Sequence, residues 1–266
     1  MRGNAPTGCR LPSRNCPSHP PVAASIIQPS SVSRVLGLTE RYEEAVSPRS
    51  RARRLYDYGP SQNCFKVRLL VAHLGVALEI VPVSIFKGEA ASPEFLAKNP
   101  MGTVPLLETD SGECLAESNA ILAFLAEGTS YMPTDGISRA QVMRWLMFEQ
   151  RYIQTSISRL RYWTLTGKLA EFAPEIATAQ ALGNRALDVL DRELGKRRFI
   201  AGDSYTIADI SIFAYSHVAA DAEFDLSARS NLTEWFDRVR AERGFKGEVV
   251  PYSTDSCSTQ KLPFAI

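Results

Sequence analysis

The stretch 104–127 constrains the fold more than any other part of the chain, because it encodes a strand, a turn, a second strand and a helix start in that order. The turn at 109–112 ends in glycine, which is typical of a β-hairpin loop. Just ahead of the hairpin, Val104 keeps its N–H and C=O free, because Pro105 cannot donate the next hydrogen bond of a ladder. An extended peptide can pair with such a backbone.

The helix expected at 118–127 starts with an acid and a hydroxyl, Glu117 and Ser118. Ser118 Oγ and the first backbone N–H groups can bind a carboxylate, and Glu117 can bind an ammonium group. One end of this region therefore suits a peptide backbone, and the other suits the head group of an α-amino acid. Glutathione, a small peptide whose γ-glutamyl part carries a free amino acid head, has both features.

The residues before this stretch predict a parallel βαβ unit. Strands are expected at 54–58 and 77–83 with a helix at 64–75 between them, and such a unit has a right-handed crossover. A short helix at 93–98 then leads to the hairpin and to the helix 118–127. The resulting order, β-α-β-α-β-β-α, is thioredoxin-like.

Beyond Ser138 the pattern is helical throughout. Apolar side chains recur at helical spacing over 139–165 and 231–243, and Thr206 with Asp209 forms a capping box at a helix start. The predicted organisation is a disordered extension, a thioredoxin-like domain, a linker, an all-α domain and a flexible tail, over residues 1–52, 53–129, 130–138, 139–245 and 246–266.

The composition is that of a globular protein, with 45% hydrophobic and 22% charged residues. The net charge of +1 argues against nucleic acid or an acidic membrane surface as partner, since both require concentrated basic residues. No apolar run approaches the roughly 20 residues needed to cross a bilayer, so we expect a soluble protein with no membrane partner.

The first 52 residues differ in kind, because they are rich in Pro, Ser and Arg and contain no lysine and no acid before Glu40. Such a segment cannot bury enough apolar surface to offset its ordering entropy, so we expect a disordered extension on a cytoplasmic protein. An organelle transit peptide and a wrongly assigned upstream start codon are the open alternatives.

The number of cysteines is odd, which favours a reducing compartment. We expect no metal site. The five cysteines are Cys9, Cys16, Cys64, Cys114 and Cys257.

Four short segments carry a resemblance to a known family: LYDYGPSQNCFKVR at 55–68, NPMGTVP at 99–105, ESNAI at 117–121 and YTIAD at 205–209. With these segments in this order and spacing, residues 55–244 resemble a soluble glutathione S-transferase of the classes that use serine or asparagine. The resemblance implies an α/β thioredoxin-like domain followed by an all-α domain, a cis Val104-Pro105 bond and a twofold homodimer. It also implies glutathione as co-substrate, and no metal.

The resemblance assigns glutathione binding to the strand edge before the hairpin and to the helix start after it. Lys87 could pair with the glycyl carboxylate of glutathione, or be an ordinary solvated loop lysine. The implied ligands are Val104 (backbone), Pro105, Glu117, Ser118, Thr103 and Lys87.

The reaction requires a thiolate at neutral pH, although a free thiol titrates near about 8.5. Ser61, directly before the first helix, matches the catalytic serine of zeta- and theta-like classes and also suits a plain N-cap. Asn63, whose amide can donate to sulfur, and Cys64, which would indicate mixed-disulfide chemistry, are the alternatives. Tyr56 and Tyr58 share one face of their strand and are assigned to packing.

The second substrate is expected to be a small, partly apolar electrophile bound between the domains. Arg159 could stabilise charge that develops on it, or form an ion pair with a neighbouring carboxylate. An aromatic stripe at helical spacing is also typical of a core face, so core packing stays open for each candidate. The candidates are Phe148, Tyr152, Arg159, Tyr162 and Trp163.

We therefore predict a glutathione transferase that acts in detoxification, with three alternatives. A glutathione-dependent thiol transferase or reductase would need Cys64. A zeta-like isomerase is favoured by Ser61, although zeta sequences carry Ser-Cys where this chain has Gln62-Asn63. A non-catalytic scaffold could reuse the fold, but it has no need of a peptide-binding strand and an anion-binding helix start.

Overall fold

The computed structural model describes residues 53–263. The extension predicted at 1–52, with Cys9 and Cys16, lies outside the described residues, as do residues 264–266. Within the described range, no helix combines the length and the apolar character needed to cross a membrane.

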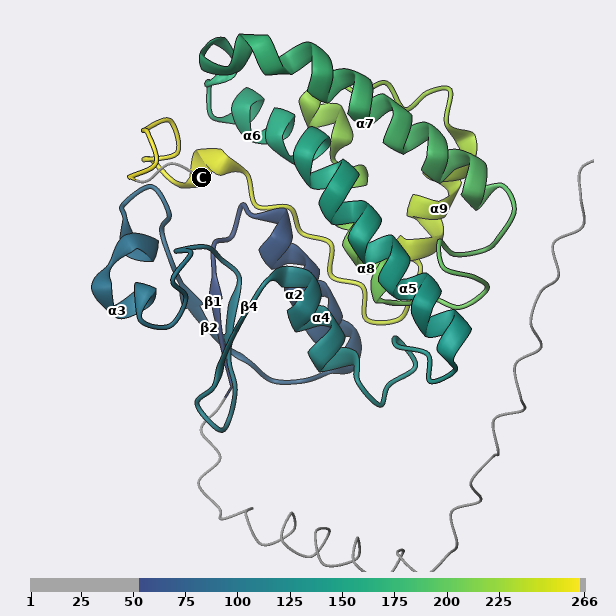
Figure 1. Cartoon of the computed structure of the whole chain (residues 1–266), viewed down its shortest axis with the longest axis horizontal. Coiled ribbons are helices and arrows are strands. Elements are labelled where there is room, and N and C mark those ends of the chain that lie inside the picture. Colours follow the sequence, from purple (N-terminus) through teal and green to yellow (C-terminus); the bar gives the residue numbers. More distant parts are fainter. Residues whose placement is uncertain (1–52, 264–266) are drawn as a thin grey trace, which may run out of the picture. The chain divides into compact units, whose positions relative to one another are not determined.

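A mixed sheet with the strand order β2-β1-β3-β4 forms the first half of the described chain (Figure 1). β2 (Glu79–Pro82) runs parallel to β1 (Arg54–Asp57), which is the predicted βαβ unit. β3 (Leu106–Glu108) and β4 (Cys114–Ala116) are antiparallel and form the predicted hairpin. The thioredoxin-like arrangement is therefore confirmed.

Side-chain alternation along the strands divides the core of this domain into two layers. Leu55 and Leu107 belong to the same apolar cluster as α2 (Gln62–Leu74) and α4 (Ser118–Ala126), on one side of the sheet (Figure 1). Leu106 packs in a separate cluster on the side of η2 (Glu89–Ala91) and α3 (Pro93–Leu96).

Helix α2 begins at Gln62, two residues earlier than predicted, because Ser61 caps it in an extended conformation (φ −71°, ψ 123°). Gly75 ends the helix with φ 64°, a conformation that glycine adopts without a steric penalty. The cap places Ser61 at the carboxyl end of β1, where it faces the second domain.

The second domain is helical, as predicted. One continuous helical run comprises α5 (Gly136–Phe148), the π-helical segment η3 (Glu149–Ser158) and α6 (Arg159–Leu165). It is followed by η4 (Leu169–Phe172), α7 (Ala173–Leu194), α8 (Ile207–Ser216), η5 (Ala219–Ala222), α9 (Ser230–Arg240) and η6 (Tyr252–Thr254).

Two helix starts in this domain follow from their caps. α5 begins inside the predicted linker, because the Asp135 side chain accepts a hydrogen bond from Ser138 N at 2.9 Å. The Thr206–Asp209 capping box is present at the start of α8, a helix buried along its whole length. Phe213 of α8 stacks on Phe65 of α2 with ring centroids 6.5 Å apart, so the two domains share one apolar core.

The described part of the chain after α9 packs back onto both domains, whereas the sequence predicted a flexible tail from residue 246. The Tyr252 ring lies 6.1 Å from the Tyr58 ring and 6.2 Å from the Tyr162 ring. Ser84 Oγ donates to Asp255 at 3.2 Å and Lys168 Nζ donates to the Ser258 carbonyl at 3.3 Å. The sequence around Tyr252 has no apolar periodicity, so this packing had no sequence signal.

Candidate functional site

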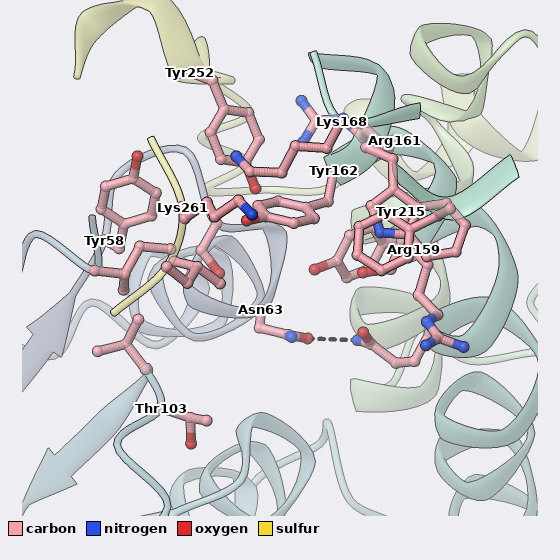
Figure 2. A pocket seen from close by; sticks show the side chains of 18 of the residues that line it. Tyr58, Asn63, Thr103, Arg159, Arg161, Tyr162, Lys168, Tyr215, Tyr252 and Lys261 are labelled. Carbon is pink, nitrogen blue, oxygen red and sulfur yellow. Dashed lines mark hydrogen bonds between the residues drawn. The ribbon is translucent and has the colours of Figure 1, made fainter. Parts of the chain in front are cut away.

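A cavity of about 680 Å³ lies between the two domains (Figure 2). The first domain contributes the loop after β1 and the segment before Pro105, and the second contributes η3, α6 and the tail. The lining residues used below are Tyr58, Ser61, Asn63, Thr103, Val104, Gln154, Arg159, Arg161, Tyr162, Trp163, Lys168, Glu171, Tyr252 and Lys261.

Ser61 is at once a helix cap and a cavity residue. Its Oγ accepts a hydrogen bond from Cys64 N at 3.4 Å, which uses one oxygen lone pair. The hydroxyl proton is not needed for that bond, so it can be donated to a group in the cavity. The two interpretations of this residue, N-cap and thiolate donor, are therefore compatible.

The Asn63 amide has an orientation set by its neighbours. Its Oδ1 accepts from Lys66 Nζ at 2.9 Å and from Gln154 Nε2 at 2.6 Å, the second bond being the dashed line in Figure 2. A lysine ammonium can only donate, so the oxygen must face Lys66. Within the described residues Nδ2 makes no hydrogen bond, which leaves an oriented N–H donor on a residue that lines the cavity.

A buried ion pair stands behind Asn63. Lys66 Nζ lies 2.9 Å from Glu149 Oε1, and both side chains are 0% exposed. Asn119 Nδ2 donates to the same carboxylate at 3.0 Å, and Gln154 Nε2 does so at 2.9 Å. Burial lowers the pKa of Lys66, and the Glu149 carboxylate opposes that shift. The pair connects α2 of the first domain to η3 of the second.

The sequence analysis missed this pair, although one signal existed. Lys66 precedes Leu69 and Leu70 by three and four residues, so it shares the apolar face of α2. A lysine on a buried face requires a partner. Its partner, Glu149, comes from the other domain, and no local pattern identifies it.

The segment before Pro105 has the geometry expected of a peptide-binding edge. The Val104-Pro105 bond is cis, and within the described residues neither the N–H nor the C=O of Val104 makes a hydrogen bond. Thr103 is held by Asn99, whose Nδ2 donates to the Thr103 carbonyl at 2.8 Å. Both Thr103 and Val104 line the cavity.

The start of α4 lies next to Asn63. Glu117 is exposed and has φ 70° and ψ 111°, a strained conformation for a residue with a Cβ. Ser118 is buried, and its Oγ accepts from Lys66 Nζ at 3.3 Å and donates to Asn63 Oδ1 at 3.3 Å. Neither residue lines the cavity directly, but both adjoin the Asn63 network.

Besides Cys64, Pro105, Glu117 and Ser118, three further predicted site residues are not among those that line the cavity. Lys87 is an exposed loop residue. Phe148 and Tyr152 pack on each other with centroids 4.8 Å apart. Eleven residues are about three α-helical turns, so an uninterrupted α-helix would place Phe148 and Arg159 on one face. The π-helical segment η3 between them changes the angular register and separates them.

Cys64 is unsuited to thiol chemistry. It is 0% exposed and its sulfur accepts from Tyr58 N at 3.4 Å. Burial, with a smaller contribution from Asp57, raises the pKa of the Cys64 thiol to about 12, so the reactive thiolate is disfavoured.

The two strand tyrosines pack as the alternation predicts. Tyr56 donates to Glu108 at 2.8 Å and packs edge-on against Phe95. Tyr58 packs against Phe86 and also lines the cavity. Burial raises the pKa of Tyr58 well above its usual range, so its phenol stays protonated.

The helical side of the cavity is aromatic and basic. The Arg159 guanidinium lies over the Trp163 ring at 5.3 Å and makes no ion pair within residues 53–263. The sequence had allowed an ion pair as an alternative role for Arg159. It gave no indication that Lys168, Tyr252 and Lys261 line the cavity. Over the same range, no group of three or more His, Cys, Asp or Glu side chains could hold a metal ion.

Comparisons with known proteins agree with this geometry. The models of the glutathione S-transferase N-terminal and C-terminal domains match residues 52–127 and 173–238. A glutathione S-transferase from Pseudomonas fluorescens Pf-5 has 37% identity and a TM-score of 0.72, over 74% of this chain and 98% of that one. Glutathione S-transferase 3 of Zea mays is 30% identical over 74% of this chain and 92% of its own length.

A second kind of relative is much longer than the matched region. Elongation factor 1-gamma of Artemia salina is 30% identical over 70% of this chain, and the match spans 43% of that protein.

Proposed function

The chain belongs to the glutathione S-transferase family, and from that premise we propose how its residues perform the reaction. It is a glutathione transferase with glutathione as co-substrate. The residue roles below are supported by the cavity between the domains and by the donors that face it.

In this proposal, glutathione binds to the segment before the hairpin and to the helix start after it. The free Val104 backbone pairs with the peptide, as an added strand does. Glu117 holds the ammonium group, and the N-terminus of α4 with Ser118 holds the α-carboxylate. Lys66 Nζ, 3.3 Å from Ser118 Oγ, holds that hydroxyl in place. The glycyl carboxylate is left for Thr103 and for one lysine, either Lys87, which lies outside the cavity lining, or Lys261, which lines it.

Ser61 stabilises the thiolate. The main support is that its Oγ caps α2 as a hydrogen-bond acceptor, so that its hydroxyl proton can still be donated into the cavity. Lowering the thiol pKa by about two units requires roughly 2.7 kcal/mol, which a hydroxyl at a helix N-terminus can supply. The Asn63 amide is a second donor from the same turn.

The thiolate then attacks an electrophile held against α6 and the tail. The protein orients the two substrates and stabilises charge, and it forms no covalent bond itself. The buried Cys64 argues against a thiol transferase mechanism in this chain.

The assembly and location follow from the family rather than from the cavity. We infer a twofold homodimer in the cytoplasm with a detoxifying role, and the exposed apolar side chains Met101, Phe124 and Met147 are candidates for the dimer contact. Sedimentation of the wild type and of Met101→Ser tests this, and a monomeric wild type would contradict it.

Calorimetry with glutathione tests the proposed function on the wild type and Ser118→Ala. Ultraviolet absorbance of the bound thiolate, on Ser61→Ala and Asn63→Ala, then identifies the donor. Binding that weakens at Ser118, with a thiolate signal that weakens at Ser61, supports the proposal. No binding by the wild type would favour a non-catalytic binding protein, a role that the similarity to elongation factor 1-gamma keeps as the second candidate.

A further inference from the structure

The charge of the cavity wall is strongly one-sided. Among the described lining residues, four carry basic side chains and one, Glu171, carries an acidic one. Arg161 already has a partner, since its Nε lies 2.9 Å from Asp221 Oδ2. Arg159, Lys168 and Lys261 have no carboxylate within 4 Å in the described part of the chain. Within the described residues, the wall therefore holds three cations that make no direct ion pair, while Glu171 acts electrostatically on Lys168 from beyond 4 Å.

Lys168 is the most informative of these cations. Its side chain is 4% exposed, and its hydrogen-bond partner in the described structure is a neutral group, the Ser258 carbonyl, at 3.3 Å. Its ammonium group lies 5.1 Å from the centroids of both the Phe86 and Tyr162 rings. A largely buried cation without an anion is costly, so an anionic ligand beside it would be stabilised.

Arg159 completes a matching arrangement on α6. Its guanidinium stacks over Trp163, as it does where arginine helps to bind a planar ligand. Arg159, Lys168 and the Tyr162 ring line the same cavity, on the side formed by the helical domain, and all three are labelled in Figure 2. Aromatic rings and cations thus line the same side of the cavity.

The two carboxylates of glutathione are bound by other residues, so they do not pair with Arg159 or Lys168. In the proposed binding mode the α-carboxylate lies at the start of α4, where Lys66 holds the Ser118 hydroxyl. The glycyl carboxylate takes one lysine, either Lys87 or Lys261. Arg159 and Lys168, which belong to the helical domain, are left facing the position of the second substrate.

We propose that the second substrate is an aromatic electrophile that carries a carboxylate or sulfonate group. Lys168 and Arg159 make this part of the cavity positive and so favour the anionic group, and the Tyr162 ring packs on the aromatic part. This inference rests on the proposed transferase function, because it names the substrate class of the same cavity.

The reaction with a haloarene of this class balances without a further reagent. The glutathione thiol first loses its proton to solvent, and the thiolate sulfur then bonds to the ring carbon. The carbon–chlorine bond breaks and chloride leaves with the electron pair. The anionic group on the far side of the ring takes no part in the bond changes, so it affects the rate through binding and through its electronic effect on the ring.

The test compares 4-chloro-3,5-dinitrobenzoate with its methyl ester, which differ in charge at one position. Each kcat/KM is divided by the rate constant of the uncatalysed reaction with glutathione, which removes the difference in intrinsic electrophilicity. We expect the normalised value for the acid to exceed that for the ester about tenfold, the effect of one charge-assisted hydrogen bond. An acid-to-ester ratio at or below one in the wild type overturns the proposal.

Variants assign the preference to residues. Arg159→Gln and Lys168→Met are each expected to bring the acid-to-ester ratio toward one. Arg151→Gln removes the same charge from an exposed arginine of η3 outside the cavity lining, and is expected to keep the wild-type ratio. If both cavity variants keep the ratio and instead raise KM for glutathione, these cations serve glutathione and the proposal fails.

A binding arm separates failure of the inference from failure of the proposed function. Calorimetry of 3,5-dinitrobenzoate and methyl 3,5-dinitrobenzoate, with S-methylglutathione present, needs no chemistry. Tighter binding of the acid without turnover of either chloro compound would support the anion site and overturn the transferase function. Turnover of the ester without preference for the acid in kinetics or binding would retain the function and overturn the anion site.

Discussion

One lysine lies buried behind the cavity wall and two basic side chains lie on the cavity surface, and the two places differ in the partners they give to a cation. Behind the wall, Lys66 is fully buried and contacts Glu149, Asn63 and Ser118. On the cavity surface, Arg159 and Lys168 contact aromatic rings and a carbonyl, and no carboxylate in the described residues. Lys66 has its counter-ion inside the protein, whereas an anion paired with Arg159 or Lys168 would have to come from a ligand.

The difference shows that the same type of basic side chain can stabilise the fold in one place and be available to bind a ligand in another. A buried pair with every polar group satisfied holds the domains in one arrangement. A cation that lacks a counter-ion is held in place by packing against rings, and its favourable partner is a ligand. The following predictions break or sharpen this distinction, from the largest effect to the smallest.

The largest effect is expected behind the wall. Lys66→Met leaves the Glu149 carboxylate buried without its cation, so we expect the free energy of unfolding to fall by about 3–5 kcal/mol. Denaturant unfolding of the variant measures the loss. The double variant Lys66→Met with Glu149→Leu is expected to regain most of it, because no buried charge is left over.

A surface pair provides the control for that prediction. Arg139 and Glu127 lie 2.7 Å apart but are 41% and 62% exposed. Arg139→Met is expected to leave the free energy of unfolding nearly unchanged, since exposed pairs contribute little. Equal losses in Lys66→Met and Arg139→Met would contradict the distinction.

The second effect lies at the boundary between the two places, where Ser61 lines the cavity and Asn63 belongs to both the cavity lining and the buried network. Ser61→Ala is expected to raise the pKa of the bound glutathione thiol by up to about two units, because the thiolate loses its hydroxyl donor. Titration of thiolate absorbance in the binary complex measures this shift. An unchanged titration in Ser61→Ala, with a shift in Asn63→Ala, would transfer the role to the amide.

A smaller effect is expected at the start of α4. Ser118→Ala removes a hydroxyl that contacts Lys66 and the expected carboxylate, so glutathione affinity should fall about tenfold. Calorimetry measures the affinity. The acid-to-ester ratio of the second substrate should stay at the wild-type value, and a matching fall in that ratio would mean that the two sites are not separate.

Salt is expected to produce the smallest effect and to act on one group alone. Arg159 is exposed, so raising the ionic strength should reduce the acid-to-ester ratio a few fold. The stability difference between the wild type and Lys66→Met should not change, because buried charges are screened much less. Steady-state kinetics and denaturant unfolding, each at low and high salt, check both statements.

Much of the first domain was predictable because its signals are local. Strand alternation, the Ser61 cap, the hairpin turn and the Val104-Pro105 pair each depend on neighbours in sequence, and the structure has them where the pattern indicates. The sequence was misleading for the second-substrate candidates, where the structure departs from the α-helical periodicity. The π-helical segment η3 separates Phe148 and Tyr152 from Arg159, although an α-helical pattern put them on one face.

The sequence predicted about half of the candidate residues that line the cavity: Ser61, Asn63, Thr103, Val104, Arg159, Tyr162 and Trp163. The Val104 edge and the Glu117-Ser118 helix start are contiguous in sequence, so their spacing carries the information. The tail is different: Tyr252 reaches the rings of Tyr58 and Tyr162, and no property of the tail sequence indicates that contact.

The sequence alone determined the family, the order of helices and strands and the segments that we propose to face glutathione, because hydrogen-bonding period, caps and turns act over a few residues. The tertiary structure decided which charges are paired and which face the cavity. Glu149 meets Lys66 because helices of two domains pack together, and over residues 53–263 no carboxylate lies within 4 Å of Lys168. Burial and ion pairing depend on distances through space, and those distances exist only once the domains have closed around a common core.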